Sequence, residues 1–111
     1  FPCKTLSYCH PSLFFHTVEV ATDKLRVPKK EFADAVRAEG VWINSHYDNL
    51  VSEWQWLQPY LKGVPQSSNA RAFRDKTFNI MFNERFSDED IADVVGSVIK
   101  VESVLAGNQP A

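Results

Sequence analysis

The sequence predicts a small α+β domain in which a mainly antiparallel sheet carries its helices on one face. This prediction rests on short apolar segments rich in β-branched and aromatic residues, with amphipathic helical segments between and after them. The chain of 111 residues is 44% hydrophobic and 23% charged, which is typical of one folded domain rather than a disordered tail. We expect a single two-layer domain over residues 1–111, with three to four strands and an irregular lead-in over residues 1–12.

The strands are predicted where β-branched and aromatic residues dominate, at residues 13–20, 41–45 and 77–82. The first of these segments is partly apolar on both faces, so we expect it to be central in the sheet rather than at an edge. Residues 46–69 form a long connection that includes a helical turn at about residues 51–61. A connection this long inside a small domain is usually functional or contacts something else.

The helices are predicted from their end signals. The first opens at Pro28, whose missing N–H costs nothing at a helix start, and closes at Gly40, which suits a left-handed cap. A short helix is expected over residues 70–75. The last helix follows Ser87, a good N-cap with Asp90 at the capping-box position. Its apolar stripe is expected to comprise the residues that recur at helical spacing, Ile91, Val94, Val95, Val98 and Ile99.

Charge and apolar run lengths argue against two classes of partner. The net charge is −2 without a basic stripe, so we expect no nucleic-acid binding. No run of about 18 apolar residues exists, so we expect no membrane span.

The chain starts at Phe1 without a signal-peptide pattern, which favours a fragment or a processed product. Cys3 and Cys9 are interpreted as reduced thiols of a cytoplasmic protein.

No residue pattern predicts a complete catalytic or metal site. The three histidines and two cysteines lack the spacing of metal ligands, so no metal is expected. No serine lies on a Gly-x-Ser-x-Gly elbow, and no glycine-rich loop is present to hold a phosphate. A nucleophilic lysine needs desolvation or a neighbouring cation. The lysines, including Lys29 and Lys30 at the expected helix start, are therefore interpreted as solvated, with only Lys76 near packed structure.

His46 and Tyr47 are the candidate binding residues, because they end a short strand and open the long connection. Side chains at strand ends on loops are favoured places for ligand contacts. The alternative is that His46 faces solvent and Tyr47 packs on the tryptophans. Trp42, Trp54 and Trp56 are close together in the sequence. They either anchor an interface or fold inward as a satellite core under the connection.

The order of motifs along the chain is recognisable. Residues 35–47 read AVRAEGVWINSHY and residues 70–91 read ARAFRDKTFNIMFNERFSDEDI. The first resembles the "L..eGI...HY" segment, and the second the "A......SLP.....t.eei" segment, of pyridoxal-phosphate-dependent aminotransferases of the DegT/DnrJ/EryC1/StrS type. Residues 15–20 look like that family's small-domain strand. The resemblance covers about residues 12–105 and identifies the chain as similar to the family's C-terminal small domain.

This resemblance implies a fold-type-I enzyme that uses pyridoxal phosphate and works as a homodimer. Such enzymes transfer an amino group, usually from glutamate, to a keto-sugar that is generally nucleotide-linked, in polysaccharide or sugar biosynthesis. The large domain of the same chain would hold the cofactor and the catalytic lysine. This segment is therefore expected to contain no catalytic or cofactor-binding residue and to be inactive alone, while His46 and Tyr47 help to shape the substrate pocket.

The chain departs from the family pattern after the HY pair, where Asp48-Asn49-Leu50 stands in place of the usual proline and further histidine, and at Met81, where the family has proline. A stand-alone small α+β ligand-binding or regulatory module is the alternative function. An upstream reading frame with a lysine-bearing aminotransferase domain would favour the enzyme. A start codon just before Phe1 would favour the module.

Overall fold

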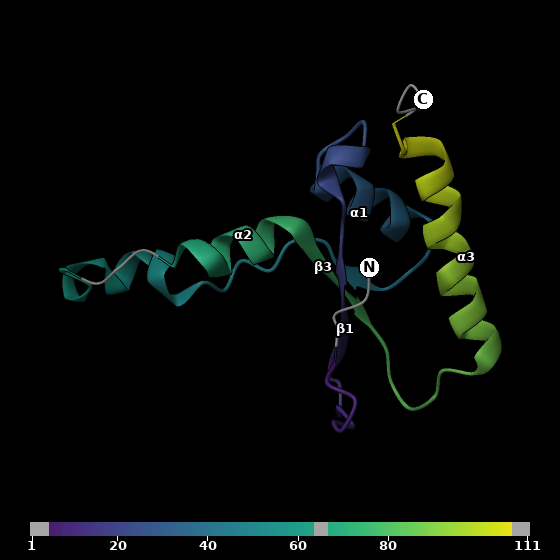
Figure 1. Ribbon diagram of the computed structural model, residues 1–111, viewed down its shortest axis with the longest axis horizontal. Helices are drawn as coiled ribbons and strands as arrows, with labels where there is room; N and C mark the ends of the chain where they lie inside the picture. The colour runs from purple at the N-terminus through teal and green to yellow at the C-terminus, as the bar shows by residue number, and fades with distance from the viewer. Residues whose placement is uncertain (1–4, 64–66, 108–111) are drawn as a thin grey trace.

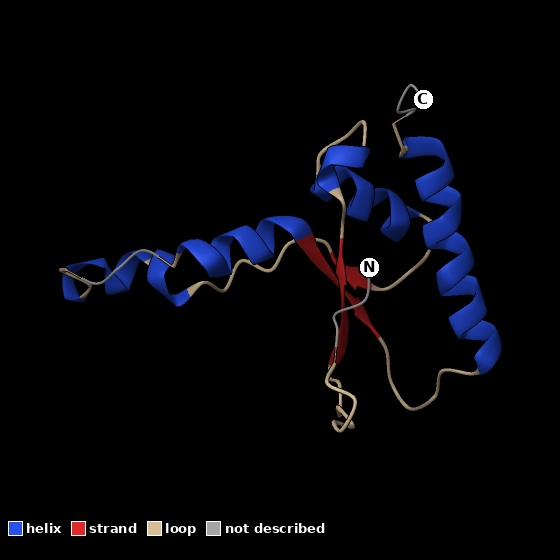
Figure 2. Cartoon of the chain, viewed as in Figure 1, coloured by secondary structure: helices blue, strands red, loops and turns tan. Residues whose placement is uncertain are grey.

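The computed structural model of the protein describes residues 5–63 and 67–107, which form a small α+β body and a projecting arm (Figure 1). The body carries its helices beside the sheet, and the arm, which comprises residues 51–63 and 67–76, extends away from it (Figure 2). The radius of gyration is 16.5 Å, whereas a compact domain of this length has about 13 Å. The predicted α+β class, with an antiparallel sheet and helices packed on it, is confirmed.

The sheet has three strands in the order β1-β3-β2, and both pairings are antiparallel. Strand β1 (Phe15–Glu19) is an edge, and the central strand is β3 (Thr77–Met81). The prediction that the first strand is central was therefore wrong. Apolar residues on both faces of a strand do not require a central position, because Phe15 lies beside the ring of Tyr47 and is not part of the hydrophobic core. Strand β2 (Ile43–Asn44) is shorter than predicted.

Helix α1 (Lys29–Ala38) begins after Pro28 and ends before Gly40, as predicted. Gly40 has a φ of 97°, a left-handed conformation that glycine adopts without steric penalty. The helix buries Phe32, Ala33 and Val36 against the sheet, which follows from their spacing on one face.

Helix α3 (Asp88–Leu105) begins with the predicted capping box. The Ser87 hydroxyl accepts from the Asp90 N–H at 3.2 Å, and the Asp90 carboxylate accepts from the Ser87 N–H at 2.7 Å. The predicted stripe, together with Val101 and Leu105 beyond it, is however divided into an inner and an outer row. The inner row packs on the core and comprises Val94, Val98, Val101 and Leu105. The outer row is exposed and comprises Ile91, Val95 and Ile99. A narrow sheet and one partner helix cover only part of the apolar surface of α3.

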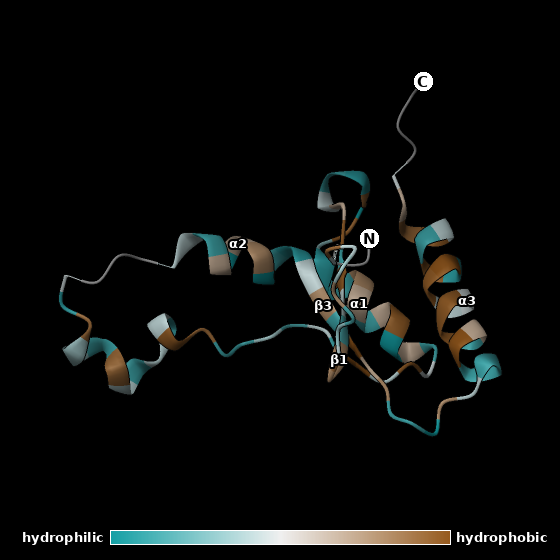
Figure 3. Ribbon diagram, turned by 60° about the horizontal axis from the view of Figure 1, so that its bottom comes forward, coloured by the Kyte–Doolittle hydropathy of each residue, from teal (hydrophilic) through white to brown (hydrophobic). Residues whose placement is uncertain are grey.

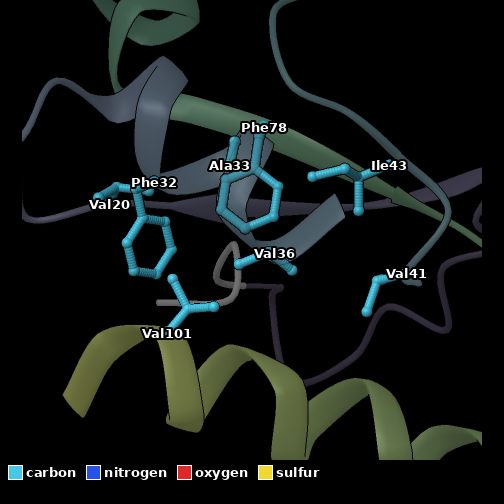
Figure 4. Close-up of a cluster of buried hydrophobic side chains, with 8 residues drawn as sticks. All are labelled: Val20, Phe32, Ala33, Val36, Val41, Ile43, Phe78 and Val101. Atoms are coloured by element: carbon cyan, nitrogen blue, oxygen red, sulfur yellow. The ribbon is translucent and has the colours of Figure 1, made fainter. Parts of the chain in front are cut away.

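One cluster of buried hydrophobic side chains forms the core between the sheet and the helices (Figure 4). The rings of Phe32 and Phe78 lie 6.2 Å apart at its centre. Its members come from every layer of the body and are Val20, Phe32, Ala33, Val36, Val41, Ile43, Phe78 and Val101. The C-terminal end of α3 is also tied to the segment before α1, because Arg26 N–H donates to the Leu105 carbonyl at 3.0 Å.

The arm consists of two short 3-10 helices and α2 (Ser68–Lys76), none of which contains a buried residue. The 3-10 helices are η2 (Val51–Glu53) and η3 (Gln55–Tyr60), in agreement with the predicted helical turn. Glu53 ties the two sides of the arm together through Arg71 at 2.8 Å and Arg74 at 2.5 Å. Within residues 5–63 and 67–107, no helix is both long and apolar enough to cross a membrane.

Candidate functional site

The end of β2 brings His46 against a buried lysine from the start of α1. Lys29 Nζ donates to the Ser45 carbonyl at 2.8 Å and lies 3.1 Å from Nδ1 of His46. Lys29 is only 5% exposed, so its interpretation as a solvated surface lysine was wrong. Side chains on a helix lean toward its N-terminus. The lysine therefore projects past the helix start, where the chain leaving β2 covers it.

The other side of the His46 ring faces a carboxylate. Its Nε2 lies 3.3 Å from Oδ1 of Asp48, and its backbone N–H donates to the Asn44 side chain at 3.1 Å. The His46 side chain is 29% exposed and that of Asp48 is 83% exposed. The ring thus has a hydrogen-bond partner at Nδ1 and a carboxylate near Nε2, and it remains accessible from solvent.

Burial, rather than the neighbouring charges as a whole, opposes the positive charge of Lys29. Burial is the main cause that lowers the pKa of Lys29, and the nearby Arg74 lowers it further. The carboxylates of Asp75, Asp48 and Asp34 act in the opposite direction. The N-terminal end of a helix is also unfavourable for a cation, because the backbone N–H groups carry partial positive charge there.

Tyr47 lies at the surface beside the edge strand. It is 42% exposed, and its ring centroid is 6.4 Å from that of Phe15. Its ring neighbour is therefore Phe15 of β1 and not one of the tryptophans. The structure brings His46 and Tyr47 together with Lys29 and Asp48, two residues that the sequence did not indicate as part of a site.

Trp42 and Trp56 are exposed and Trp54 is half-buried, and none of the three belongs to the hydrophobic core. The rings of Trp54 and Trp56 stack at 5.7 Å, while Trp42, Trp56 and Tyr60 are 60%, 67% and 78% exposed. Hydrophobic residues lie along both the arm and α3 (Figure 3). The interpretation of the aromatic residues as a surface available to a partner agrees with this exposure.

The described residues do not fit pyridoxal phosphate. Lys29 is a buried amine, but its Nζ is engaged by Ser45 and His46. Gly40 and Gly63, the glycines with positive φ, lie in separate turns and form no phosphate cradle. Among residues 5–63 and 67–107, no cluster of histidine, cysteine or acidic side chains is placed to hold a metal. Cys9 is an exposed free thiol, and Cys3 lies outside the described residues.

A second feature is a pocket of about 310 Å³ between the end of β1, the turn before α1 and α3. Val20, Phe32 and Val98 form part of its apolar wall, and Glu19 and Lys24 contribute charged groups. The sequence did not indicate this pocket, because its walls come from segments far apart along the chain.

No protein-family model and no curated protein matches the chain.

Proposed function

We propose that this chain is the small domain of a cytoplasmic pyridoxal-phosphate-dependent aminotransferase that aminates a nucleotide-linked keto-sugar. The resemblance over about residues 12–105 supports this assignment, and the α+β fold agrees with it. The cofactor and the catalytic lysine belong to the large domain. This chain covers the active-site cleft, and His46 and Tyr47 contact the substrate.

The observation that carries the proposal is that the His46 ring is held by its neighbours and is also partly exposed. Its ring is fixed by Lys29 and Asp48 at the end of β2, yet 29% of the side chain is exposed. A polar ring that is held on both sides and open to solvent is suited to bind and orient a ligand, because its rotamer is settled before binding. Tyr47 adds an exposed phenol, which offers an aromatic face and a hydroxyl beside the histidine.

Exposed apolar rows support the presence of large neighbours. The outer row of α3 is 46%, 51% and 58% exposed at Ile91, Val95 and Ile99. The arm exposes Trp56 and Tyr60. Contiguous apolar surface of this kind marks interaction sites. In the proposed enzyme, the large domain of the same chain and the second subunit of a homodimer are the partners that cover it.

The stand-alone ligand-binding module is supported by a different observation, the pocket of about 310 Å³ beside Phe32 and Val98. Its volume is at the lower end of the range for small-molecule sites. The reading frame upstream of Phe1 separates the two functions. We expect an aminotransferase domain with its catalytic lysine, whereas a start codon directly before Phe1 would contradict the enzyme assignment.

The site itself is tested in the intact enzyme by the double variant His46→Ala/Tyr47→Ala. We expect kcat/KM for the keto-sugar to fall about tenfold or more, because oriented hydrogen bonds are lost, while the absorption band of the bound cofactor is retained. The matched control is Tyr8→Ala/His10→Ala, which removes the same residue types from the exposed lead-in. Unchanged turnover together with an unchanged KM in the His46/Tyr47 variant would refute the site.

A further inference from the structure

We propose that Lys29 is a positioning residue for His46 and that it directs the Nε2–H of this ring toward an acceptor oxygen of the substrate. The identity of the ligand rests on the function proposed above. The hydrogen bonds that support the proposal lie within this chain, so they can be tested separately from that function.

The chemistry of the two partners selects one form of the ring. An ammonium group can only donate a hydrogen bond, and a carboxylate can only accept one. Lys29 Nζ lies 3.1 Å from Nδ1, and Asp48 Oδ1 lies 3.3 Å from Nε2. With Lys29 protonated, Nδ1 is the acceptor, and the neutral ring carries its proton on Nε2, which faces the Asp48 carboxylate.

The two partners of the ring differ in how firmly they are held. Lys29 is 5% exposed and is anchored on the Ser45 carbonyl at 2.8 Å, whereas the Asp48 side chain is 83% exposed. The hydrogen bond at Nδ1 is therefore fixed, whereas the exposed Asp48 carboxylate beside Nε2 is replaceable. A hydroxyl, carbonyl or phosphate oxygen of the substrate can take the place of Asp48 without moving the ring.

Packing alone does not explain an ammonium at this position. A methionine has a similar length and would bury its side chain without desolvating a charge. Burial lowers the pKa of Lys29, and the start of α1 also opposes a cation. Residues that violate local stability rules are expected at functional sites. Here the charged group has an identifiable partner, the His46 ring.

Nitrogen-15 NMR of the unaltered chain near neutral pH is the first test. We expect the His46 Nδ1 to be unprotonated and its Nε2 protonated, with a coupling across the hydrogen bond between Lys29 Nζ and Nδ1. The His46 signals are assigned by their loss in His46→Gln. A protonated Nδ1 would overturn the proposal, and this result does not depend on the folding of any variant at Lys29.

The second test compares Lys29→Met with Lys30→Met. Lys30 is the matched control, because its side chain is 63% exposed and pairs with Asp34 instead of the ring. We expect the Nδ1 resonance to move in Lys29→Met and to stay in place in Lys30→Met. In the intact enzyme, Lys29→Met should lower kcat/KM about threefold to tenfold, the range for one oriented hydrogen bond. An unmoved Nδ1 resonance refutes the positioning role. A moved resonance in an enzyme that lacks sugar aminotransferase activity refutes the proposed function and leaves the positioning role supported.

Discussion

The body and the arm of this molecule are held together by different interactions. Every residue of the buried hydrophobic cluster lies in the body, whereas neither the 3-10 helices of the arm nor α2 contains a buried residue. The arm depends instead on the ion pairs of Glu53 with Arg71 and Arg74, and on the stack of Trp54 with Trp56. The body is therefore stabilised by apolar burial, and the arm by ion pairs, which salt weakens, and by one aromatic stack.

This difference shows which region buries its apolar side chains within the chain and which leaves them exposed. The body buries Phe78 and Val36 almost fully, and such side chains contribute about 1.5–3 kcal/mol each. The arm presents its aromatic residues to solvent, so its packing energy becomes available only when a partner covers it. Substitutions in the two regions should consequently change different properties of the protein.

The largest decrease in the free energy of unfolding is expected from Phe78→Ala in the centre of the body. Phe78 is 1% exposed, and removing a buried phenylalanine costs about 3–5 kcal/mol through lost burial and the cavity left behind. Trp56→Ala in the arm is the counterpart, because Trp56 is 67% exposed, and it should change the free energy of unfolding by less than about 0.5 kcal/mol. Denaturant unfolding measures both. Equal losses would mean that the arm is part of the cooperative unit.

A smaller effect is expected from Ser87→Ala, which removes the N-cap of α3. The free energy of unfolding should fall by about 1 kcal/mol, because the Asp90 N–H loses its acceptor. The hydrogen bonds from Ser87 also lower the pKa of Asp90 from its ordinary value of 3.8. The stabilisation from Asp90 is therefore present above that value and is lost as the pH falls through the lower folded-state pKa. Ser12→Ala, in the exposed lead-in, is the control and should leave the midpoint unchanged. An equal drop in both variants would contradict the cap.

The smallest global effect is expected from Glu53→Gln, which acts on the arm alone. Amide hydrogen exchange should become faster over residues 51–76 and stay unchanged in β1 and β3, because the body does not depend on this tie. Arg74 is the first cause that lowers the pKa of Glu53 from its ordinary value of 4.5, and Arg71 adds to it. The tie is therefore fully present above that value and weakens as the pH falls through the folded-state pKa.

Glu84→Gln, on an exposed loop, is the matched control for the arm. It should leave hydrogen exchange in residues 51–76 unchanged. Slow hydrogen exchange throughout the arm in Glu53→Gln would show that the ion pairs are dispensable. It would contradict the claim that ion pairs stabilise the arm.

The features that could be predicted from the sequence are those set by nearby residues. Pro28 and Gly40 bound α1, and Ser87 with Asp90 starts α3, because caps and left-handed turns depend on only a few neighbouring positions. The apolar and aromatic residues of positions 77–82 likewise indicated the strand β3. These elements were confirmed with small shifts at their ends.

The features that were missed depend on segments far apart in the sequence. The edge position of β1 and the rotation of α3, which turns Val95 outward and Val98 inward, are decided by how many elements share the core. The burial of Lys29 is decided by the segment after β2, which lies across the start of α1. His46 was identified from its strand-end position, whereas its partners Lys29 and Asp48 became evident only once these segments were placed together.

The strand order β1-β3-β2 determines when the sheet can form during synthesis. The strand made last lies between the two made earlier, and those two do not pair with each other. No local hairpin can therefore begin the sheet, which closes only after the whole arm and Thr77–Met81 have left the ribosome. Until then, β1 and β2 have unpaired edges, which is the condition in which nascent chains associate wrongly. A product that stops before Thr77 contains both outer strands and no sheet.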